Sequence, residues 1–211
     1  MPRNLQQWRV LEAADLECER GGRALFRNLS FALGAGELLR VAGPNGSGKT
    51  SLLRILCGLL PPARGEVRWN GERIQALRED FSRQLVYVGH APAIKDDLTA
   101  YENLMIACVL AGHAQEGPRL LEALRNFGLK EHDVPVKSLS QGQRRRAALA
   151  RLALSGRSPL WLLDEPFAAL DADAARLLED AVAAHVARGG LVVYSTHQES
   201  RIGGRLISLD A

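Results

Sequence analysis

Hydrophobic and polar positions alternate loosely between Leu11 and Leu33, which is typical of antiparallel strands with one buried face. Elsewhere apolar residues run together, as they do in strands that are covered on both faces. These runs occur at 37–42, 84–88, 160–163 and 191–194. The pattern therefore predicts an α/β fold in which a parallel core sheet is accompanied by an antiparallel β layer.

Helical periodicity dominates between about Ala91 and Gln143. Within this stretch, Thr99 and Glu102 have the spacing of a capping box, and Gly128 ends a second helix. The predicted helices cover 50–60, 103–110, 119–127, 143–154 and 171–188. We predict a single domain, with a core formed by 1–90 and 144–211 and a helical subdomain formed by 91–143.

Composition narrows the class of protein without identifying it. The chain has 211 residues, of which 46% are hydrophobic and 24% are charged, so it can bury one sizeable core. No apolar run approaches the roughly 20 residues that span a bilayer, and residues 1–8 lack the apolar stretch of a secretory signal. We therefore expect a cytoplasmic location. Three widely spaced cysteines predict reduced thiols, and a net charge of +3 is a weak argument for nucleic-acid binding.

The first candidate binding residues form a glycine-rich run directly after the predicted strand at 37–42. The run consists of Gly43, Pro44, Asn45, Gly46, Ser47, Gly48, Lys49 and Thr50, with Ser51 next to it. This spacing is typical of a phosphate loop, in which backbone N–H groups surround nucleotide phosphates at the start of a helix. Lys49 then reaches the terminal phosphates and the Thr50 hydroxyl binds Mg²⁺. The run predicts a site for ATP and Mg²⁺.

Two acids and a histidine lie at the ends of later apolar runs. Asp164 and Glu165 follow the strand at 160–163, where Asp164 would lie beside Mg²⁺ and Glu165 could polarise an attacking water. His197 ends the run that begins at 191, and its imidazole could hydrogen-bond the γ-phosphate. These positions predict that the chain hydrolyses ATP.

Together with Leu139–Gln143 and Asp171, these motifs resemble the nucleotide-binding subunit of an ABC transporter over nearly the whole chain. The resemblance implies that Ser140, Gln141, Gly142, Gln143 and Asp171 complete a site for ATP held by the phosphate loop of a second subunit. Each motif occurs once, so the resemblance implies a homodimer with two ATP molecules between the subunits. Arg146 and Arg151 also occupy positions where the family carries arginines.

Two positions depart from the usual ABC pattern. His90 replaces a glutamine that in the family touches Mg²⁺ and the attacking water and joins the two lobes, so we count His90 with the catalytic residues. Arg20 lies where an aromatic residue normally stacks on adenine. A guanidinium plane can also stack on a base, so we expect Arg20 to contribute to ATP binding.

The segment from Tyr87 to Leu104 and the segment Cys18–Arg20 further resemble the ATP-binding subunit of the bacterial cytochrome c biogenesis system. This resemblance implies docking on multi-spanning inner-membrane subunits, on the cytoplasmic side. It also implies that hydrolysis drives release of a haem-loaded periplasmic chaperone, or haem export. The alternatives are an ABC ATPase for another exported substrate and a soluble nucleotide-gated ABC clamp of translation or DNA repair. The latter usually has tandem cassettes or a long coiled-coil insertion, and we find neither pattern here.

Several conspicuous residues have simpler interpretations. The run Arg144–Arg146 at a helix start is interpreted as a solvated face rather than a nucleic-acid site. His113, His132 and His185 lack companion ligands and are interpreted as surface residues. Trp69 and Trp161 fall in strands, where we expect them to pack in the core.

Overall fold

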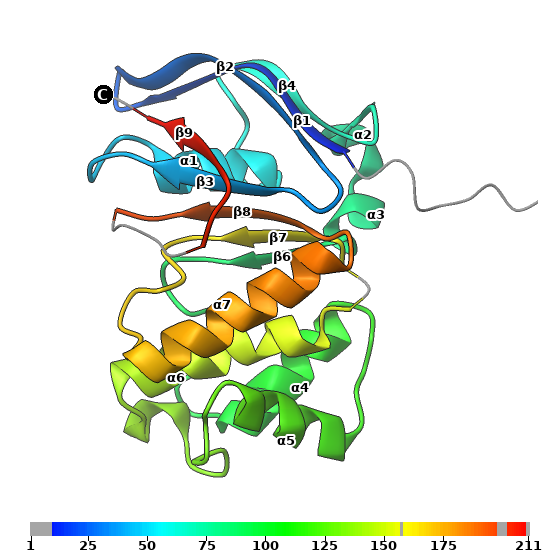
Figure 1. Ribbon diagram of the computed structural model, residues 1–211, viewed down its shortest axis with the longest axis vertical. Helices are drawn as coiled ribbons and strands as arrows, with labels where there is room; N and C mark the ends of the chain where they lie inside the picture. The colour runs from blue at the N-terminus through cyan, green and yellow to red at the C-terminus, as the bar shows by residue number, and fades with distance from the viewer. Residues whose placement is uncertain (1–9, 157, 198–201, 210–211) are drawn as a thin grey trace, which may run out of the picture. The chain divides into compact units, whose positions relative to one another are not determined.

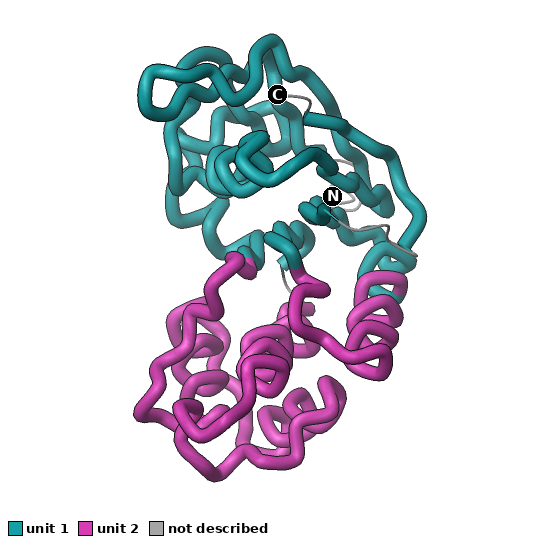
Figure 2. Tube along the Cα trace, turned by 90° about the vertical axis from the view of Figure 1, so that its left-hand side faces the viewer, with its two compact units in different colours: residues 1–87, 158–165, 184–211 teal, residues 88–157, 166–183 magenta. Residues whose placement is uncertain are grey.

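In the computed structural model, the alternating and the continuous apolar runs form two separate sheets (Figure 1). The structure describes residues 10–156, 158–197 and 202–209. The chain divides into two compact units, as Figure 2 shows. Unit 1 contains residues 1–87, 158–165 and 184–211, and unit 2 contains residues 88–157 and 166–183. Both sheets are assigned to unit 1, apart from the last residue of one strand.

The first sheet is antiparallel and has the strand order β2-β1-β4-β5. Its strands are β1 (Val10–Arg20), β2 (Arg23–Gly34), β4 (Arg64–Trp69) and β5 (Glu72–Arg73). The pair β1–β2 confirms the strands predicted from the alternation between Leu11 and Leu33. The two strands pair over their full length, with several register shifts between them. Leu11, Leu16 and Leu33 are fully buried on one face of this pair. This sheet therefore presents an apolar surface to the rest of unit 1.

The second sheet contains the continuous apolar runs, in the order β6-β7-β8-β3-β9. Its strands are β3 (Leu38–Ala42), β6 (Leu85–Val88), β7 (Leu160–Leu163), β8 (Leu191–Ser195) and β9 (Arg205–Ser208). The pairs β7–β8, β8–β3 and β3–β9 are parallel, so the carboxyl ends of these strands meet at one edge of the sheet. The predicted phosphate loop follows the end of β3, the two predicted acids follow the end of β7, and His197 follows the end of β8.

Helix α1 (Lys49–Leu56) supplies part of the core that both sheets share. Leu52, Leu53, Ile55 and Leu56 are at most 1% exposed, and they pack with apolar residues of β1, β2, β3, β7 and β8. The helix ends four residues before the predicted boundary at residue 60. Gly58 has φ 77° and its N–H bonds the Ile55 carbonyl, so a glycine stop precedes the prolines. The short helices α2 (Ile74–Leu77) and α3 (Glu79–Ser82) lead to β6.

Unit 2 is mainly helical. It contains α4 (Ala100–Leu110), α5 (Gly117–Asn126), the 3₁₀ turn η1 (Val136–Ser138), α6 (Gln141–Leu149), the 3₁₀ segment η2 (Ala150–Leu154) and most of α7 (Ala172–Ala187). The capping box predicted at α4 is confirmed: Thr99 Oγ1 accepts from the Glu102 N–H, and the Glu102 carboxylate accepts from the Thr99 N–H. Among the described residues, no helix is both long enough and apolar enough to cross a bilayer.

The prediction of a solvated arginine face was wrong for Arg145. This side chain is only 3% exposed, and its guanidinium donates to the carbonyl oxygens of Gly89 at 2.8 Å, His90 at 3.2 Å and Pro166 at 3.4 Å. Carbonyls of two loops within unit 2 thus replace the water that a charged group would otherwise require. Arg145 is therefore a structural residue that holds these loops.

The prediction that His185 is a surface residue was also wrong. His185 is 6% exposed, and its ring stacks on Trp161 with centroids 3.9 Å apart. Its Nε2 lies 3.0 Å from the Pro159 carbonyl oxygen, which fixes this nitrogen as the donor. Burial of His185 is possible because the last turn of α7 packs on β7 within unit 1. Trp69 and Trp161, at 1% and 2% exposure, are core residues as predicted.

Candidate nucleotide site

The phosphate loop connects the end of β3 to the start of α1 within unit 1. Gly48 precedes the helix with φ 100°, and a Cβ placed there would lie 3.0 Å from the Leu25 Cβ and 3.1 Å from the Phe26 ring. Both the backbone conformation and the space therefore require glycine. Lys49 is 7% exposed, and its Nζ donates to the carbonyl oxygens of Gly43 at 2.7 Å and Pro44 at 3.0 Å. The lysine thus folds back over the loop.

The loop fits a phosphate group. The Ser47 hydroxyl is buried without a hydrogen-bond partner among the described residues. The first turn of α1 contains no acidic side chain, so the positive end of the helix dipole is not neutralised there. Thr50 and Ser51 lie in this turn. A buried hydroxyl, a lysine and open helix amides together form a binding site for an anion.

Asp164 and Glu165 follow β7 at the same edge of the sheet. Asp164 is fully buried, while Glu165 has a 12% exposed side chain and the left-handed backbone value φ 48°. Such a conformation costs a residue other than glycine on the order of 1–3 kcal/mol. The sequence predicts the two acids but not this strained turn. The turn directs the Glu165 carboxylate towards two partners in unit 1.

Those partners are the predicted residues Lys49 and His197. Glu165 Oε1 lies 3.9 Å from Lys49 Nζ, and Glu165 Oε2 lies 3.0 Å from His197 Nδ1. In the neutral imidazole Nδ1 is then the donor, and Nε2 is an acceptor that becomes a donor only when the ring is protonated. The structure therefore brings together the lysine, both acids and the histidine that the sequence predicted for ATP hydrolysis.

Ser51 and Arg20 lie on neighbouring elements of unit 1. Burial raises the pKa of the Cys18 thiol of β1 above its ordinary value, against a smaller lowering by the Ser51 side chain, so the thiol stays protonated. Arg20 is exposed at the end of β1. All three cysteines are free, as predicted.

The predicted residues Ser140, Gln141, Gly142 and Gln143, called the signature residues below, lie in unit 2, at the start of α6. Ser140 Oγ accepts from the Gln143 N–H at 3.2 Å, and the Ser140 N–H donates to Gln143 Oε1 at 2.8 Å. A Cβ on Gly142 would lie 2.9 Å from the Ala169 carbonyl oxygen, so the loop leaves no room for a larger residue. Gln141 is exposed. The spacing Ser-x-x-Gln is itself a capping-box signal, so the start of this helix could have been predicted from the sequence.

Asp171 caps the start of α7 in the same unit. Its Oδ1 accepts from the Ala174 N–H at 2.9 Å, and its Oδ2 pairs with Arg146. The Ala174 N–H first, and Arg146 in addition, hold the pKa of the Asp171 carboxyl below its ordinary value. Arg146 also donates to the Gly128 carbonyl oxygen at 3.1 Å. Arg146 therefore has a defined structural partner, in contrast to the solvated role predicted for it.

His90 follows β6 with an exposed side chain, and its carbonyl oxygen accepts a hydrogen bond from Arg145. The backbone at His90 is thus anchored while its imidazole is accessible. Unit 2 consequently contains the predicted signature residues, Asp171 and His90, and unit 1 contains the phosphate loop, the acids and His197.

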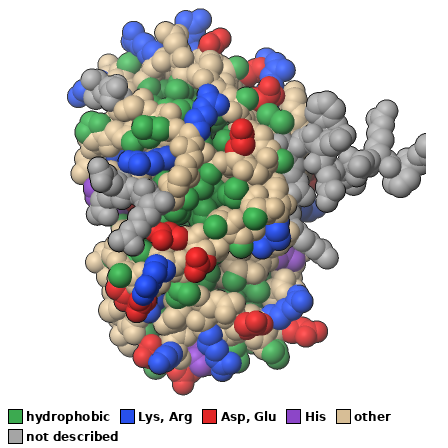
Figure 3. Space-filling model, in the orientation of Figure 1, with side chains coloured by type: hydrophobic (Ala, Val, Ile, Leu, Met, Phe, Trp, Pro, Cys, Tyr) green, Lys and Arg blue, Asp and Glu red, His purple; other side chains and the backbone are tan. Residues whose placement is uncertain are grey.

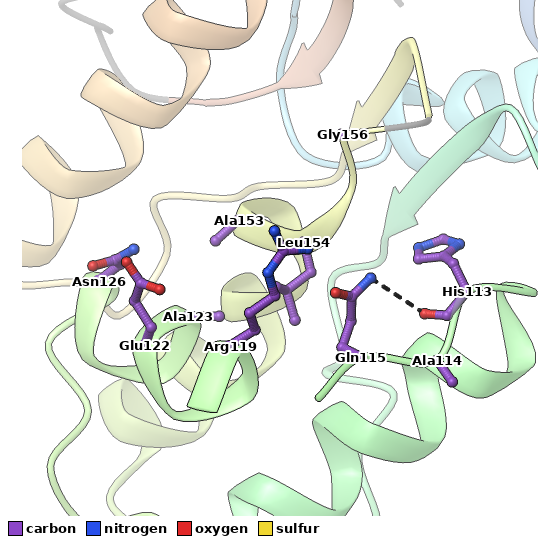
Figure 4. Close-up of a pocket in the computed structure, with 10 residues that line it drawn as sticks. All are labelled: His113, Ala114, Gln115, Arg119, Glu122, Ala123, Asn126, Ala153, Leu154 and Gly156. Atoms are coloured by element: carbon purple, nitrogen blue, oxygen red, sulfur yellow. Dashed lines mark hydrogen bonds between the residues drawn. The ribbon is translucent and has the colours of Figure 1, made fainter. Parts of the chain in front are cut away.

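A separate cavity of about 590 Å³ lies in unit 2, between α5 and η2 (Figure 4). His113, Gln115, Arg119 and Asn126 line it, and Gln115 Nε2 donates to the His113 carbonyl oxygen at 3.4 Å. None of the predicted nucleotide-site residues lines this cavity. The described residues contain no group of three His, Cys, Asp or Glu side chains that could hold a metal ion.

The charged surface does not favour one sign on the face drawn in Figure 3. Lys and Arg side chains there alternate with Asp and Glu side chains. Ion pairs such as Lys137–Asp97 at 2.9 Å and Arg144–Asp96 at 3.5 Å neutralise basic residues of unit 2 locally. This mixed pattern is consistent with the small net charge and differs from the continuous basic stripe of nucleic-acid-binding domains.

Comparison with known proteins supports the same chemistry. Residues 26–168 match the ABC transporter family model. The cytochrome c biogenesis ATP-binding export protein CcmA of Aromatoleum aromaticum is 54% identical over 90% of both chains. The protein of the same name from Nitrosospira multiformis is 49% identical over 94% of this chain and 96% of that relative.

Solved structures extend the likeness to the fold. The dimeric structure of MJ0796, a bacterial ABC transporter cassette, has a TM-score of 0.84 and 26% identity over 95% of this chain and 94% of that chain. A post-hydrolysis dimer of MJ0796 with ADP and Pi has a TM-score of 0.79 and 25% identity over 89% of this chain and 88% of that chain. The chain therefore belongs to the ABC transporter family of ATP-binding ATPases, among the cytochrome c biogenesis ATP-binding export proteins.

Proposed function

We propose that this ATPase is the motor subunit of an inner-membrane complex for cytochrome c biogenesis, where hydrolysis drives release of a haem-loaded periplasmic chaperone or haem export. The observation that carries the proposal is the 54% identity, over 90% of both chains, to a relative that bears this export name. The arrangement of Lys49, Glu165 and His197 in unit 1 supports a hydrolytic rather than a purely binding role.

In this proposal each residue of the site has one task. Lys49 and the amides of the phosphate loop bind the phosphates of ATP. Thr50 and Asp164 would hold Mg²⁺, because a hydroxyl and a buried carboxylate are oxygen ligands that suit this ion, and the ion would neutralise phosphate charge. Glu165 accepts the proton of the attacking water, His197 orients the γ-phosphate, and Arg20 stacks on the base.

The active form is a homodimer with two bound ATP molecules. Each chain then contributes its phosphate loop to one site, and its signature residues Ser140 and Gly142, with Asp171, to the other. The capping box at Ser140 and the close contact of Gly142 support this role, because both hold the start of α6 in a single conformation. The MJ0796 cassette, whose fold this chain shares, is a dimer.

The proposed docking face for the membrane subunits covers 90–104 and continues along α4. Met105, Ile106, Val109 and Leu110 are 39%, 41%, 56% and 83% exposed. Their spacing places them as two i, i+4 pairs along one side of the helix. An exposed apolar stripe of this kind is a protein-contact surface rather than a solvated one, so we place a cytoplasmic loop of a membrane subunit on it.

This chain should restore c-type cytochromes in a bacterium whose own relative has been deleted, whereas a Lys49→Ala variant should not. The pair Val109→Glu and Leu110→Glu should also fail in this assay, because it places two charges within the apolar stripe. We expect this variant to lose at least tenfold in co-purification with the membrane subunits and to keep its ATP affinity, since both positions lie on the surface.

Leu59→Glu is the matched control, because Leu59 is an apolar residue of unit 1 with 66% exposure. It should behave as the unmodified chain in both assays. Normal cytochrome formation by the doubly charged variant would refute docking on α4. Failure of the unmodified chain beside a functioning native relative would refute the export role itself.

His90 is proposed to act in hydrolysis in its neutral form. A histidine changes charge within the physiological pH range, whereas the glutamine usual in the family does not. His90→Gln should keep at least roughly a third of the ATPase rate and lose less activity on acidification from pH 7.5 to 6 than the unmodified chain. Both proteins retain His197, so the comparison isolates His90. Parallel pH profiles would show that the imidazole of His90 has no chemical role.

A further inference from the structure

Ser195 is a buried residue of unit 1 that no motif includes. It ends β8, is fully buried, and precedes His197 by two positions. The parallel register pairs Leu163 with Tyr194, so the next residues, Asp164 and Ser195, lie side by side where the two strands end. The register thus places a hydroxyl group beside the turn that carries both catalytic-site acids.

The Ser195 hydroxyl makes two hydrogen bonds in opposite senses. It donates to Asp164 Oδ1 at 2.7 Å and accepts from the backbone N–H of Glu165 at 2.9 Å. A hydroxyl can do both at once, whereas a methyl group can do neither. The bond to the carboxylate is charge-assisted, and both bonds lie in a fully buried environment, where they are strongest.

These bonds act on the residue with the strained backbone. Glu165 has φ 48°, a conformation that a residue with a side chain adopts only when its surroundings hold it there. The Ser195 hydroxyl accepts a hydrogen bond from the Glu165 N–H and so holds the backbone of this residue. The Glu165 side chain extends from that backbone, and its carboxylate lies 3.0 Å from His197 Nδ1 and 3.9 Å from Lys49 Nζ. The direction of the carboxylate therefore depends on the peptide that Ser195 fixes.

We propose that Ser195 is a positioning residue for ATP hydrolysis, which fixes Asp164 and the Glu165 backbone relative to each other so that the Glu165 carboxylate faces the attacking water. The inference rests on the proposed role of Glu165 as general base. We place Ser195 outside the contacts to the nucleotide, because it is fully buried and its hydroxyl already donates to the Asp164 carboxylate and accepts from the Glu165 N–H. Its loss should thus lower the rate of the chemical step and leave substrate binding intact.

Steady-state hydrolysis by the full chain tests this separation. Ser195→Ala should lower kcat about 10²-fold, the effect of a misplaced catalytic group, with KM for ATP changed less than twofold. Ser195→Thr keeps a hydroxyl on the same carbon and should recover at least a tenth of the unmodified rate. Ser158→Ala removes a hydroxyl that is also buried in unit 1, bonded to the Arg83 carbonyl oxygen, and should leave kcat unchanged.

A double variant separates positioning from general damage. If Ser195 acts through Glu165, Ser195→Ala should have less than a threefold effect on the residual rate of a Glu165→Gln protein, because the group it positions is already gone. The inference would be overturned if Ser195→Ala kept full activity, or if its KM for ATP rose by about the same factor as its kcat fell. The same 10²-fold loss of rate in the Glu165→Gln background would also overturn it. Full activity of Glu165→Gln would instead refute Glu165 as base, which distinguishes the two failures.

Discussion

Glu165→Gln will lower the ATPase rate about 10²–10⁴-fold, which is the usual effect of removing a general base. The glutamine amide has nearly the shape of the carboxylate but cannot accept the proton of the attacking water. ATP binding should be retained, because the phosphate loop and Lys49 remain. Since hydrolysis normally ends the ATP-bound state, the variant should accumulate as a dimer that elutes earlier in size-exclusion chromatography with ATP than without it.

Glu72→Gln provides the control, because it makes the same change of charge at an exposed position of unit 1. Its rate and its elution should match those of the unmodified chain. A Glu165→Gln protein that elutes as a monomer with ATP at high protein concentration would contradict the proposed two-site dimer. A variant that hydrolyses ATP at the normal rate would remove Glu165 from the mechanism.

Arg145→Met will destabilise unit 2 by about 3 kcal/mol or more. The methionine fills most of the space but leaves the carbonyls of Gly89, His90 and Pro166 without their buried donor. The bond to Pro166 is buried and those to Gly89 and His90 are partly buried, and a buried acceptor that loses its partner costs about 1–3 kcal/mol. At about 2–4 °C per kcal/mol for a chain of this size, Tm should fall by roughly 6–12 °C.

Thermal unfolding monitored by circular dichroism measures this loss. Arg119→Met removes a cation of the same unit from an exposed position and should change Tm by less than about 2 °C. Arg145→Lys keeps the charge, but its ammonium group can reach fewer carbonyls. Its Tm should therefore lie between the Tm of Arg145→Met and that of Arg119→Met. An unchanged Tm in Arg145→Met would mean that water replaces the guanidinium at no cost.

The sheets and the nucleotide motifs could be predicted because the relevant signals are local. A strand covered on both faces needs an unbroken apolar run, and the residues after 163 and 196 then lie at the carboxyl edge of the sheet. The phosphate loop depends on glycines, which Gly48 illustrates through its left-handed φ and its contact with Phe26. The capping box at Thr99 is likewise complete within four residues.

Arg145, His185 and Ser195 were misjudged or overlooked because their partners are remote in sequence. The bonds from Arg145 reach 56 residues back, and those from Ser195 reach 31 residues back. A signal for Arg145 did exist: it lies three, four and seven residues before Ala148, Leu149 and Leu152, all of which are buried. Helical periodicity alone would have placed this arginine on the inner face, but it could not supply the acceptors.

Strand β9 has a consequence for the order in which this protein is made. It pairs with β3, and the N–H of Leu209 bonds the Ala42 carbonyl oxygen, directly before the phosphate loop. The ribosome therefore makes the loop at 43–50 long before the strand that supports it. At about 5–20 residues per second, synthesis of the intervening 150-odd residues takes roughly 10–30 seconds. Until β8 and then β9 have been made, β3 has no strand partner in the sheet on either side, and the nascent chain has to be protected there against pairing with other chains.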